Sequence, residues 1–274
     1  LSGWASPHED LAQELASFLG RDRALLFSSG YLANLGAIST FADRHTDVFH
    51  DRLNHASLID GVRLSGGKSV RYRHADLSDL SSRLQRSQAH KKLVVTDTVF
   101  SMDGDQAPLR ELAGAAASHE ALFYCDEAHA FGVAAEGKGM VVAEGLRQQD
   151  VPLVMVTFGK SLGTAGAAVV GRRDLIDALL QKARPFIYDT ALPPMVAAAT
   201  RVSLRILQDE PERVACLRAR IMHFAASMRA TGLQPLGNDS PIQPILLGED
   251  ERALAAAELL RESGFYVRAI RPPT

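Results

Sequence analysis

Short apolar runs alternate with longer amphipathic stretches along the first two thirds of the chain. The runs have the length of buried strands, and the stretches between them repeat their apolar positions with the period of a helix. The expected strands are ALLFSS (24–29), SVRYRH, KLVVTDTV, ALFYCDE, LVMVTF and AAVVG, and the expected helices are SPHEDLAQELASFLG, 30–42, 57–65, 77–88, 109–118 and 173–184. Such an alternation predicts an α/β protein with a mostly parallel sheet covered by helices on both faces.

The first of these helices has recognisable ends. Ser6 suits the N-cap, Pro7 the first helical position and Glu9 the third position of a capping box. Gly20 is expected to stop the helix.

The pattern changes near YDTALPP. Pro193 and Pro194 break the chain there, and a long helical stretch runs from about 195 to 231. After it, IQPILL, DERALAAAELLRESG and FYVRAI predict a strand, a helix and a strand. The sequence therefore predicts a large domain over 1–207 and a smaller C-terminal α/β domain over 208–274.

Composition indicates a globular protein and argues against nucleic acid or a membrane as its partner. The 274 residues are 46% hydrophobic and 23% charged, which is enough apolar material for a large core. A net charge of −2 gives no basic field for nucleic acid, and no run approaches the ~20 apolar residues of a membrane span. Cys125 and Cys216 form no CxxC pair and are expected to be reduced and buried, which fits a cytoplasmic protein. The start lacks a leader and an initiating Met, so the sequence is expected to be a fragment, and no motif indicates a metal.

Two segments imitate the motifs of an ATPase. FGKS resembles the end of a P-loop, and LFYCDEAH resembles the acidic strand of a DEAH helicase. A P-loop needs a glycine five residues before its Gly-Lys pair so that its amides can surround phosphate, but that position is Val154. The acidic strand also precedes the lysine, in the reverse of the ATPase order. An ATPase therefore stays only as a minor alternative.

Lys160 follows the apolar run VPLVMV in a turn of small residues. A lysine in such a turn can approach a flat ring, and partial desolvation lowers the pKa of its amine, which favours Schiff-base chemistry. The commonest role of a single lysine is nevertheless that of a solvated turn residue. A pyridoxal phosphate (PLP) site needs four partners besides the lysine: an acid at the pyridine nitrogen, a stacking group, a donor to the phenolic oxygen and a phosphate nest.

Each of these partners has a candidate. Asp126 ends a predicted strand and could pair with the pyridine nitrogen, and His129 follows it by three residues. Ser29 and Gly30 lie between a strand and a helix, where free amides bind phosphate. His55, in DRLNHASL, could stack on the ring. Each candidate alone is weak, because ordinary strand ends, loops and helix caps also contain these residues, but together they favour PLP.

The combined segments resemble the α-oxoamine synthases, a family of fold-type-I PLP enzymes, over nearly the whole chain. The resemblance is carried by RALLFSSGYLAN, DRLNHASL, VFSMDGDQAPL, DEAHAFGV, VTFGKSLGTAGAAVVG, YDTALPP, IQPILLGE and AIRPPT. It implies PLP as the cofactor and a homodimer whose active sites are shared between subunits.

The resemblance also implies residue roles. Lys160 matches the Schiff-base lysine, Asp126 the acid at the pyridine nitrogen, His129 the donor to the phenolic oxygen, and His55 a stacking histidine near the substrate. The further implied contacts are Gly30 and Tyr31 at the phosphate, Ser101 and Thr157 at the cofactor, Thr190 at the phosphate of the neighbouring subunit, and Thr274 on the substrate side.

Within the family, VTFGK, IQPILLGE and AIRPPT favour one reaction. It condenses L-alanine with a pimeloyl thioester of coenzyme A or a carrier protein, and gives 8-amino-7-oxononanoate, CO₂ and free thiol in biotin biosynthesis. Sister enzymes that use glycine (aminoketobutyrate ligase, aminolevulinate synthase) or serine (serine palmitoyltransferase) stay as alternatives. A non-catalytic PLP-fold scaffold is disfavoured because Lys160 and Asp126 are both present.

The chain also departs from the family pattern. The family has an N-terminal segment with a substrate-contacting arginine, and an arginine for the amino-acid carboxylate beyond RPPT; this sequence contains neither stretch, so we expect either missing ends or an incomplete protein. Ala130 and Phe131 replace residues that are often smaller or polar, which would reshape the acyl-chain entrance. Asp97 stands where Glu is usual.

Overall fold

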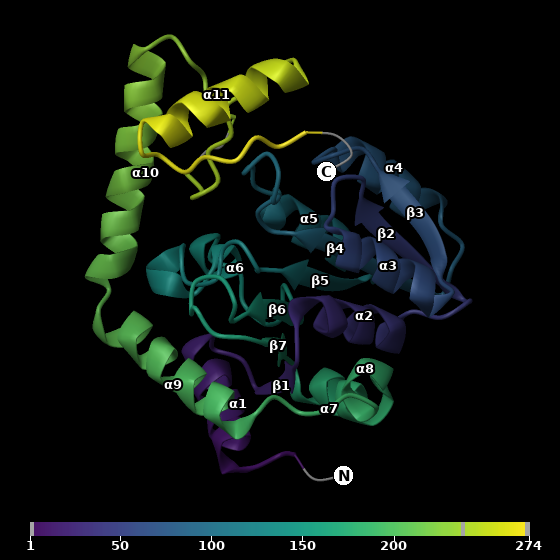
Figure 1. Ribbon diagram of the computed structural model, residues 1–274. Coiled ribbons are helices and arrows are strands. Elements are labelled where there is room, and N and C mark those ends of the chain that lie inside the picture. The colour runs from purple at the N-terminus through teal and green to yellow at the C-terminus, as the bar shows by residue number, and fades with distance from the viewer. Residues whose placement is uncertain (1–2, 237–238, 272–274) are drawn as a thin grey trace.

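The computed structural model describes residues 3–236 and 239–271, and it contains one twisted sheet with helices on both faces (Figure 1). The strand order is β1-β7-β6-β5-β4-β2-β3. The strands are β1 (Arg23–Phe27), β2 (Thr46–Asp51), β3 (Lys68–Tyr72), β4 (Lys91–Asp97), β5 (Leu122–Asp126), β6 (Leu153–Thr157) and β7 (Ala167–Gly171). Strands β2 to β6 pair in parallel, and β7 runs antiparallel to both β1 and β6. The predicted α/β class with a mostly parallel sheet is confirmed.

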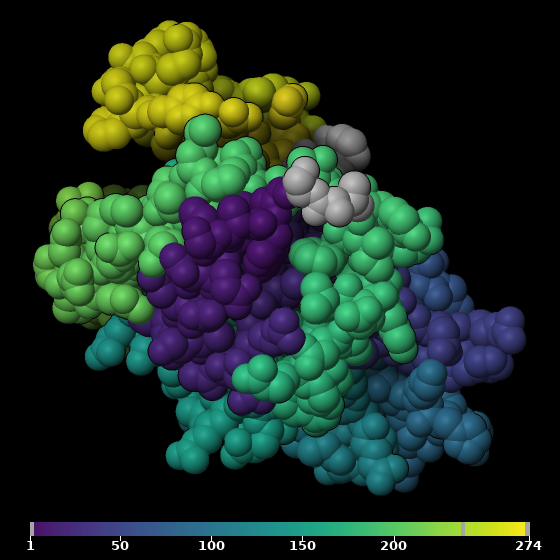
Figure 2. All heavy atoms as spheres, turned by 90° about the horizontal axis from the view of Figure 1, so that it is seen from below, coloured from purple at the N-terminus to yellow at the C-terminus, as the bar shows by residue number. Residues whose placement is uncertain are grey.

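Helices α1 (Ser6–Phe18), α4 (Leu77–Arg86), α5 (Leu109–Ser118), α6 (Met140–Ala143) and α9 (Pro194–Asp209) pack on one face of the sheet. Helices α2 (Gly30–Phe41), α3 (Ala56–Ser65), α7 (Arg173–Lys182) and α8 (Arg184–Ile187) pack on the other. The remaining elements are the short 3₁₀ helix η1 (Ala135–Gly137), α10 (Glu212–Ala230) and α11 (Asp250–Glu262). In Figure 2, which views the molecule from below, purple α1 lies against the green segment that contains α9.

Side chains of the central strands alternate between the two faces, as the pleat requires. In β5, Phe123 and Cys125 belong to the core on the α1 side, whereas Tyr124 belongs to the core on the α2 side. Both cores are apolar because helices cover the central strands on both faces. The strand end at Asp126 consequently projects on the α2 side, where α2 begins.

One strand was not predicted from the sequence. The segment TDVFHD forms β2, and all six of its residues are buried. Its polar side chains find partners far along the chain: Asp47 accepts from the Ser87 hydroxyl at 2.7 Å, and His50 pairs with the Ser69 hydroxyl at 2.8 Å. Only such long-range partners make a half-polar strand tolerable in the interior.

The C-terminal part differs from its prediction in two ways. The helix expected from 195 to 231 is two helices, α9 and α10, because Pro211 cannot donate the next helical hydrogen bond and disfavours helical geometry at Glu210. The expected strands IQPILL and FYVRAI are not strands, and that region holds only an isolated bridge between Pro235 and Ile245 among the described residues. A strand needs a hydrogen-bonding neighbour, and these segments lie away from the sheet (Figure 1).

The proposed border between 207 and 208 falls inside the last turn of α9, and the division into two domains stays a prediction. Helix α11 buries no residue, and α10 buries only Ile221 and Ala225. The C-terminal part therefore contributes little to the two cores, in keeping with its projecting position in Figure 2.

Smaller expectations were partly wrong. The N-cap of α1 is Ala5 rather than Ser6, and the Nδ1 atom of His8 accepts the Ala5 amide at 3.0 Å. Gly20 does follow the helix end, with a φ of 62°. Cys125 is buried and free, but Cys216 is exposed, because α10 turns most of its surface to solvent. No helix within residues 3–236 and 239–271 combines the length and the apolar character needed to span a bilayer.

Candidate active site

Three neighbouring parallel strands end in polar side chains at the same edge of the sheet. Strand β4 ends at Asp97, β5 at Asp126 and β6 at Thr157, and the register places Asp97 beside Asp126. These ends border a cavity of about 200 Å³. Its lining residues are Gly30, Tyr31, Asn34, His55, Ser57, Asp97, Asp126, Ala128, His129, Met155, Thr157 and Lys160. The carboxyl ends of parallel strands are the usual place for a ligand site in α/β proteins.

The Asp126 carboxylate is held in the cavity by two hydrogen bonds. Its two carboxylate oxygens accept from the Asn34 side-chain amide at 2.7 Å and from the Ala128 backbone amide at 2.8 Å. The Asn34 oxygen accepts in turn from the buried Tyr124 hydroxyl at 2.7 Å. Burial raises the pKa of Asp126, while these hydrogen bonds oppose the rise. A cation placed against this carboxylate would complete the compensation of a buried charge.

Lys160 occupies a tight turn directly after β6. The turn is closed by hydrogen bonds from Thr164 N to Phe158 O at 3.0 Å and from Gly163 N to Lys160 O at 3.2 Å. Lys160 is solvent-accessible at the cavity mouth, and the cavity walls still displace enough water to lower the pKa of its amine. The charges of Asp126 and Asp97 only partly offset this effect. A lysine with a lowered pKa is the more easily deprotonated nucleophile.

Two histidines border the same cavity. His55 is the N-cap of α3, and its Nδ1 atom accepts from the Ser57 amide at 3.2 Å. Its own backbone amide donates to a carboxylate oxygen of Asp97 at 2.7 Å. Burial, with the charges of Lys160 and His55, lowers the pKa of His129 to about 4. His129 is therefore neutral near pH 7, with one nitrogen that donates and one that accepts.

Asp97 is a buried acid that sequence reasoning noticed only as a departure from the family pattern. Burial raises its pKa well above the ordinary value, and the neighbouring charge of Asp126 adds to the rise. Asp97 positions the neighbouring loop through two hydrogen bonds. Its carboxylate accepts from the His55 backbone amide, and its own backbone amide donates to the Asn54 side-chain oxygen at 3.2 Å. The loop that ends at His55 is thereby fastened to β4.

The opposite side of the cavity is formed by the start of α2. Ser29 is the N-cap, and its hydroxyl accepts from the Leu32 amide at 3.2 Å. The amides of Gly30 and Tyr31 belong to the first turn, where a helix has no internal acceptor to offer, so they are available to an anion. A Cβ atom at position 30 would lie 2.6 Å from Cγ2 of Thr157, so only glycine permits this approach of α2 to β6.

The structure brings most of the predicted site residues together, but not all of them. Seven predicted positions line the cavity: Gly30, Tyr31, His55, Asp126, His129, Thr157 and Lys160. Ser101 lies in the turn after β4 and is not among the lining residues, and exposed Thr190 borders a separate surface pocket with Trp4 and His8. Thr274 lies outside the described residues. The individual roles remain predictions.

Two polar residues of the cavity, Asn34 and Ser57, were missed by sequence reasoning. Asn34 holds Asp126, and Ser57 receives a hydrogen bond from the second amide hydrogen of Asn34 at 2.8 Å. Both lie inside motifs that were recognised, FSSGYLAN and DRLNHASL. The available signal was spacing: Asn34 follows Gly30 by four residues, so a helix that begins at Gly30 places both on one face.

Comparison with known proteins identifies the relationship. A family model described as aminotransferase class I and II matches residues 5–274. The chain belongs to this family. The matched range includes FGKS, so the comparison supports the aminotransferase-family interpretation of that segment rather than the P-loop one.

Relatives within the aminotransferase class I and II family are α-oxoamine synthases. An 8-amino-7-oxononanoate synthase from Saccharophagus degradans is 51% identical over 275 residues, which cover 100% of this chain and 69% of the relative. The enzyme of the same name from Methylococcus capsulatus is 52% identical over 273 residues, covering 99% of this chain and 70% of the relative. The predicted membership of the α-oxoamine synthases is confirmed.

Solved structures agree with this placement. Serine palmitoyltransferase from S. paucimobilis, with a bound PLP–myriocin aldimine, superposes with a TM-score of 0.94 at 36% identity over 98% of this chain and 70% of that one. An 8-amino-7-oxononanoate synthase from Francisella tularensis gives a TM-score of 0.88 at 32% identity over 100% of this chain and 80% of that one. The predicted fold-type-I architecture is confirmed.

The residues of the cavity fit PLP. The Thr157 hydroxyl is buried and has no hydrogen-bond partner within the described structure, so it is available to a phosphate beside the α2 amides. Because Gly30 has no side chain, the first turn of α2 can lie close to Thr157. Asp126 supplies a fixed carboxylate and Lys160 an amine with a lowered pKa. An anion nest, a nucleophilic amine and a buried acid in one cavity are the requirements of this cofactor.

Proposed function

We propose that this chain carries the PLP-dependent site of an enzyme that condenses L-alanine with a pimeloyl thioester to give 8-amino-7-oxononanoate, CO₂ and free thiol, in biotin biosynthesis. The observation that carries the proposal is the shared cavity of Lys160 and Asp126, in a chain about 50% identical to synthases of that name. The pimeloyl carrier, coenzyme A or a carrier protein, is left open.

The reaction balances without any further reagent. The Cα–H bond of alanine breaks, and a bond forms between that carbon and the pimeloyl carbonyl while the C–S bond breaks and the thiol leaves with a proton. The alanine carboxylate then departs as CO₂ and a proton takes its place. PLP, when bound, supplies an aldehyde for covalent attachment and a ring that withdraws electrons from the breaking bonds.

The residues of this chain would position the cofactor and the substrate and would transfer the protons. Lys160 would hold the cofactor and, once its Nζ is released, take the proton from alanine, a task for which its lowered pKa suits it. Asp126, fixed by Asn34 and Ala128, would keep a proton on the pyridine nitrogen by accepting from it. Neutral His129 would donate to the phenolic oxygen.

His55 would cover the ring and act on the substrate side. The His55 backbone is held by Asp97 and its Nδ1 atom by Ser57, so the position of the His55 imidazole is defined before substrate binds. Gly30, Tyr31, Ser101 and Thr157 would complete the cofactor contacts. Thr190, which lies outside the cavity, would reach the phosphate of a second copy, so we propose a homodimer with shared sites. The substrate-side role of Thr274 and the cytoplasmic location stay predictions.

Replacement of Lys160 tests the central assignment. The Lys160→Ala variant is expected to bind PLP without covalent attachment and to lose turnover by several orders of magnitude, because both the attachment point and the base are gone. Borohydride reduction followed by peptide mapping should label Lys160 in the wild type. Lys182→Ala, at an exposed position of α7, is the matched control and should keep both labelling and activity. Labelling of a different lysine would refute the assignment.

Replacement of Asp126 tests the acid. Asp126→Asn is expected to retain PLP but to lose roughly 10²–10³-fold in kcat, because a neutral amide cannot stabilise the charged ring nitrogen. Cofactor content by absorbance and turnover should be measured on the same preparation. Turnover close to wild type at full cofactor content would contradict this role.

The substrate is tested by competition. Purified protein with PLP should be offered alanine, glycine and serine with pimeloyl, acetyl, succinyl and palmitoyl thioesters, and the ketone product identified by mass. The pimeloyl–alanine pair is expected to give the highest kcat/KM. A preference for glycine or serine would move the chain to a sister activity, and no product with any pair would favour a non-catalytic fold.

A further inference from the structure

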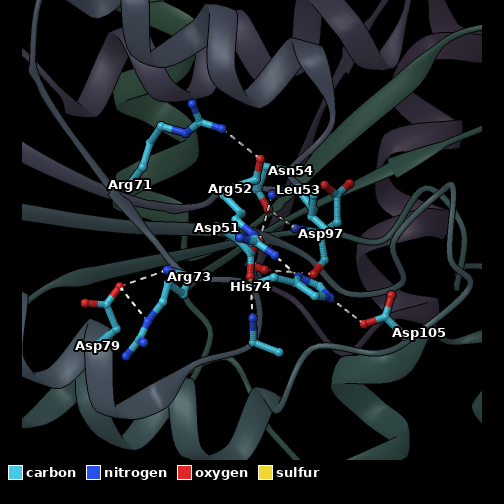
Figure 3. Close-up of polar contacts among 12 residues, drawn as sticks. Asp51, Arg52, Leu53, Asn54, Arg71, Arg73, His74, Asp79, Asp97 and Asp105 are labelled. Carbon is cyan, nitrogen blue, oxygen red and sulfur yellow. Dashed lines mark hydrogen bonds and ion pairs between the residues drawn. The ribbon is translucent and has the colours of Figure 1, made fainter. Parts of the chain in front are cut away.

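His74 lies just after β3, outside the cavity, with a carboxylate at each ring nitrogen (Figure 3). Its Nδ1 atom lies 3.0 Å from Oδ1 of Asp51, and its Nε2 atom lies 2.6 Å from Oδ2 of Asp105. Asp51 ends β2, whereas Asp105 belongs to the loop between β4 and α5. His74 thus joins two segments that are distant in the sequence.

The Asp51 side of this bridge leads directly to His55. The Asp51 carboxylate is 1% exposed and also accepts from the Leu53 amide at 2.8 Å and from the Ala75 amide at 2.8 Å. It therefore fixes the first half of the loop 52–55, and Asp97 fixes the second half through the His55 amide. Figure 3 shows both acids around this loop.

The Asp105 side leads to Ser101. The Asp105 backbone oxygen accepts from the Phe100 amide at 2.9 Å, and the Gly104 amide donates to the Phe100 oxygen at 2.9 Å, so these hydrogen bonds close the turn that carries Ser101. The His74 ring meets the Phe100 ring edge-on, with centroids 4.5 Å apart. His74 touches this turn through both a charged and an apolar contact.

The contacts define the charge of the ring. An ionised carboxylate only accepts hydrogen bonds, so two carboxylates at the two nitrogens require both nitrogens to donate, which is the imidazolium form. Asp51 receives three donors and has no acceptor to which a proton could point. Partial burial alone lowers the pKa of His74, but the hydrogen bonds and charges of Asp51 and Asp105 outweigh it and raise the pKa overall. Arg73, the neighbouring cation, is paired with Asp76 and Asp79.

We propose that His74 is a positioning residue, which as a cation ties the loop of His55 to the turn of Ser101 so that both are held together around the cofactor. This inference rests on the proposed function, because the two loops matter only if they hold PLP. The bridge should be intact at pH values below about 6.5, where even an unpaired histidine is charged, and should weaken as the pH rises through the elevated pKa of His74.

Two variants and one control test the bridge. His74→Gln keeps a donor and an acceptor but no charge, and Asp105→Asn removes one of the two carboxylates while leaving the ring. His90→Gln changes an exposed histidine and is the matched control. The measurements are the NMR titration of the His74 ring, the dissociation constant of PLP from circular dichroism of the bound cofactor at each pH, and kcat with KM for alanine.

In the wild type, PLP affinity is expected to fall as the pH passes the titration midpoint of His74. His74→Gln should weaken PLP binding roughly tenfold or more at low pH, the loss expected for a hydrogen bond to a charged group, and should flatten the pH dependence. Asp105→Asn should move the midpoint of the fall to lower pH together with the NMR midpoint. His90→Gln should reproduce the wild type.

Unchanged pH dependence in His74→Gln, or an unmoved midpoint in Asp105→Asn, would overturn the inference. If His74→Gln does not fold, the Asp105→Asn midpoint decides alone. A drop in thermal stability with the wild-type PLP profile would show a merely structural role and also overturn it. Wild-type protein that neither binds PLP nor forms product would instead remove the proposed function on which the inference rests.

Discussion

Asn34 illustrates how a single residue can set the chemistry of a buried acid. Without partners, a carboxylate inside a protein becomes protonated, because the charged form loses its hydration. The Asn34 amide nitrogen donates to Asp126, and the Asn34 oxygen accepts from the Tyr124 hydroxyl. The Tyr124 hydroxyl therefore fixes which end of the Asn34 side chain faces Asp126. Tyr124 is 1% exposed and donates its only hydroxyl proton to Asn34. A rotation of the Asn34 amide by half a turn would therefore break its hydrogen bonds to both Asp126 and Tyr124.

Replacement of Asn34 should therefore cost more than replacement of its outer partner. Asn34→Ala removes one of the two hydrogen bonds to Asp126 and leaves the buried Tyr124 hydroxyl without an acceptor, so it is expected to lower the free energy of unfolding by about 2–4 kcal/mol, with a loss of activity. Tyr124→Phe, the matched control, removes one neutral hydrogen bond and should cost about 1 kcal/mol while keeping most activity. Urea unfolding and steady-state kinetics measure both. Equal effects of the two changes would contradict this order.

The residue scale also shows what sequence could foretell about the site. Lys160, Asp126 and His129 were recognisable because the chemistry of one cofactor demands those side chains in those local settings. Asn34 has no chemistry of its own, and its role depends on the alternation that places Asp126 and Tyr124 on one face of β5. Such a role follows from three-dimensional neighbours, which a one-dimensional pattern does not contain.

At the scale of elements, the site depends on how closely α2 approaches β6. The first turn of α2 offers amides to an anion, and Thr157 at the end of β6 offers a hydroxyl. The absence of a side chain at Gly30 sets their distance, because a Cβ there would meet Thr157 at 2.6 Å and Met155 at 3.4 Å. Here glycine serves close approach rather than an unusual backbone angle.

Replacement of Gly30 by alanine should consequently separate these two elements. Gly30→Ala is expected to weaken PLP binding by roughly 10- to 100-fold, since the helix start or Thr157 must move and several donors lose alignment with the phosphate. Gly114→Ala in α5 is the control: a Cβ there meets nothing within 4 Å, and the change should raise stability by about 0.5–1 kcal/mol. Equilibrium titration with PLP gives both affinities, and an unchanged affinity in Gly30→Ala would be contrary to this account.

Most strands that were predicted correctly share one property, and β3 (Lys68–Tyr72), in which only Tyr72 is buried, is the exception. Strands β1, β4, β5, β6 and β7 are apolar runs whose burial can be read locally. Strand β2 was missed because Asp47, His50 and Asp51 are buried only through partners in later segments. The apolar run IQPILL was taken for a strand, but an apolar run forms a strand only where a neighbouring strand supplies hydrogen bonds.

At the scale of the whole molecule, the most exposed apolar side chains on the sheet-bearing part flank Thr190. Tyr188 is 71% exposed and Met195 is 77% exposed, on either side of the segment that the family resemblance assigns to a neighbouring subunit. Thr190 itself lies outside the cavity of its own chain. A site completed by a second copy would explain both features, because the same surface would meet its counterpart across a twofold axis.

Mixing two inactive variants tests that arrangement. Lys160→Ala destroys a subunit's own site but leaves its Thr190 intact, whereas Thr190→Glu keeps Lys160 but places a carboxylate at the partner's phosphate. If sites are shared, a mixed dimer has one complete site, and equal mixing with random exchange should restore about a quarter of the wild-type activity per subunit. Exchange is achieved by mild denaturation and refolding, and light scattering confirms the dimer. Full activity of Thr190→Glu alone, or no recovery on mixing, would show that Thr190 has no role in the partner's site. Each site would then lie within one chain.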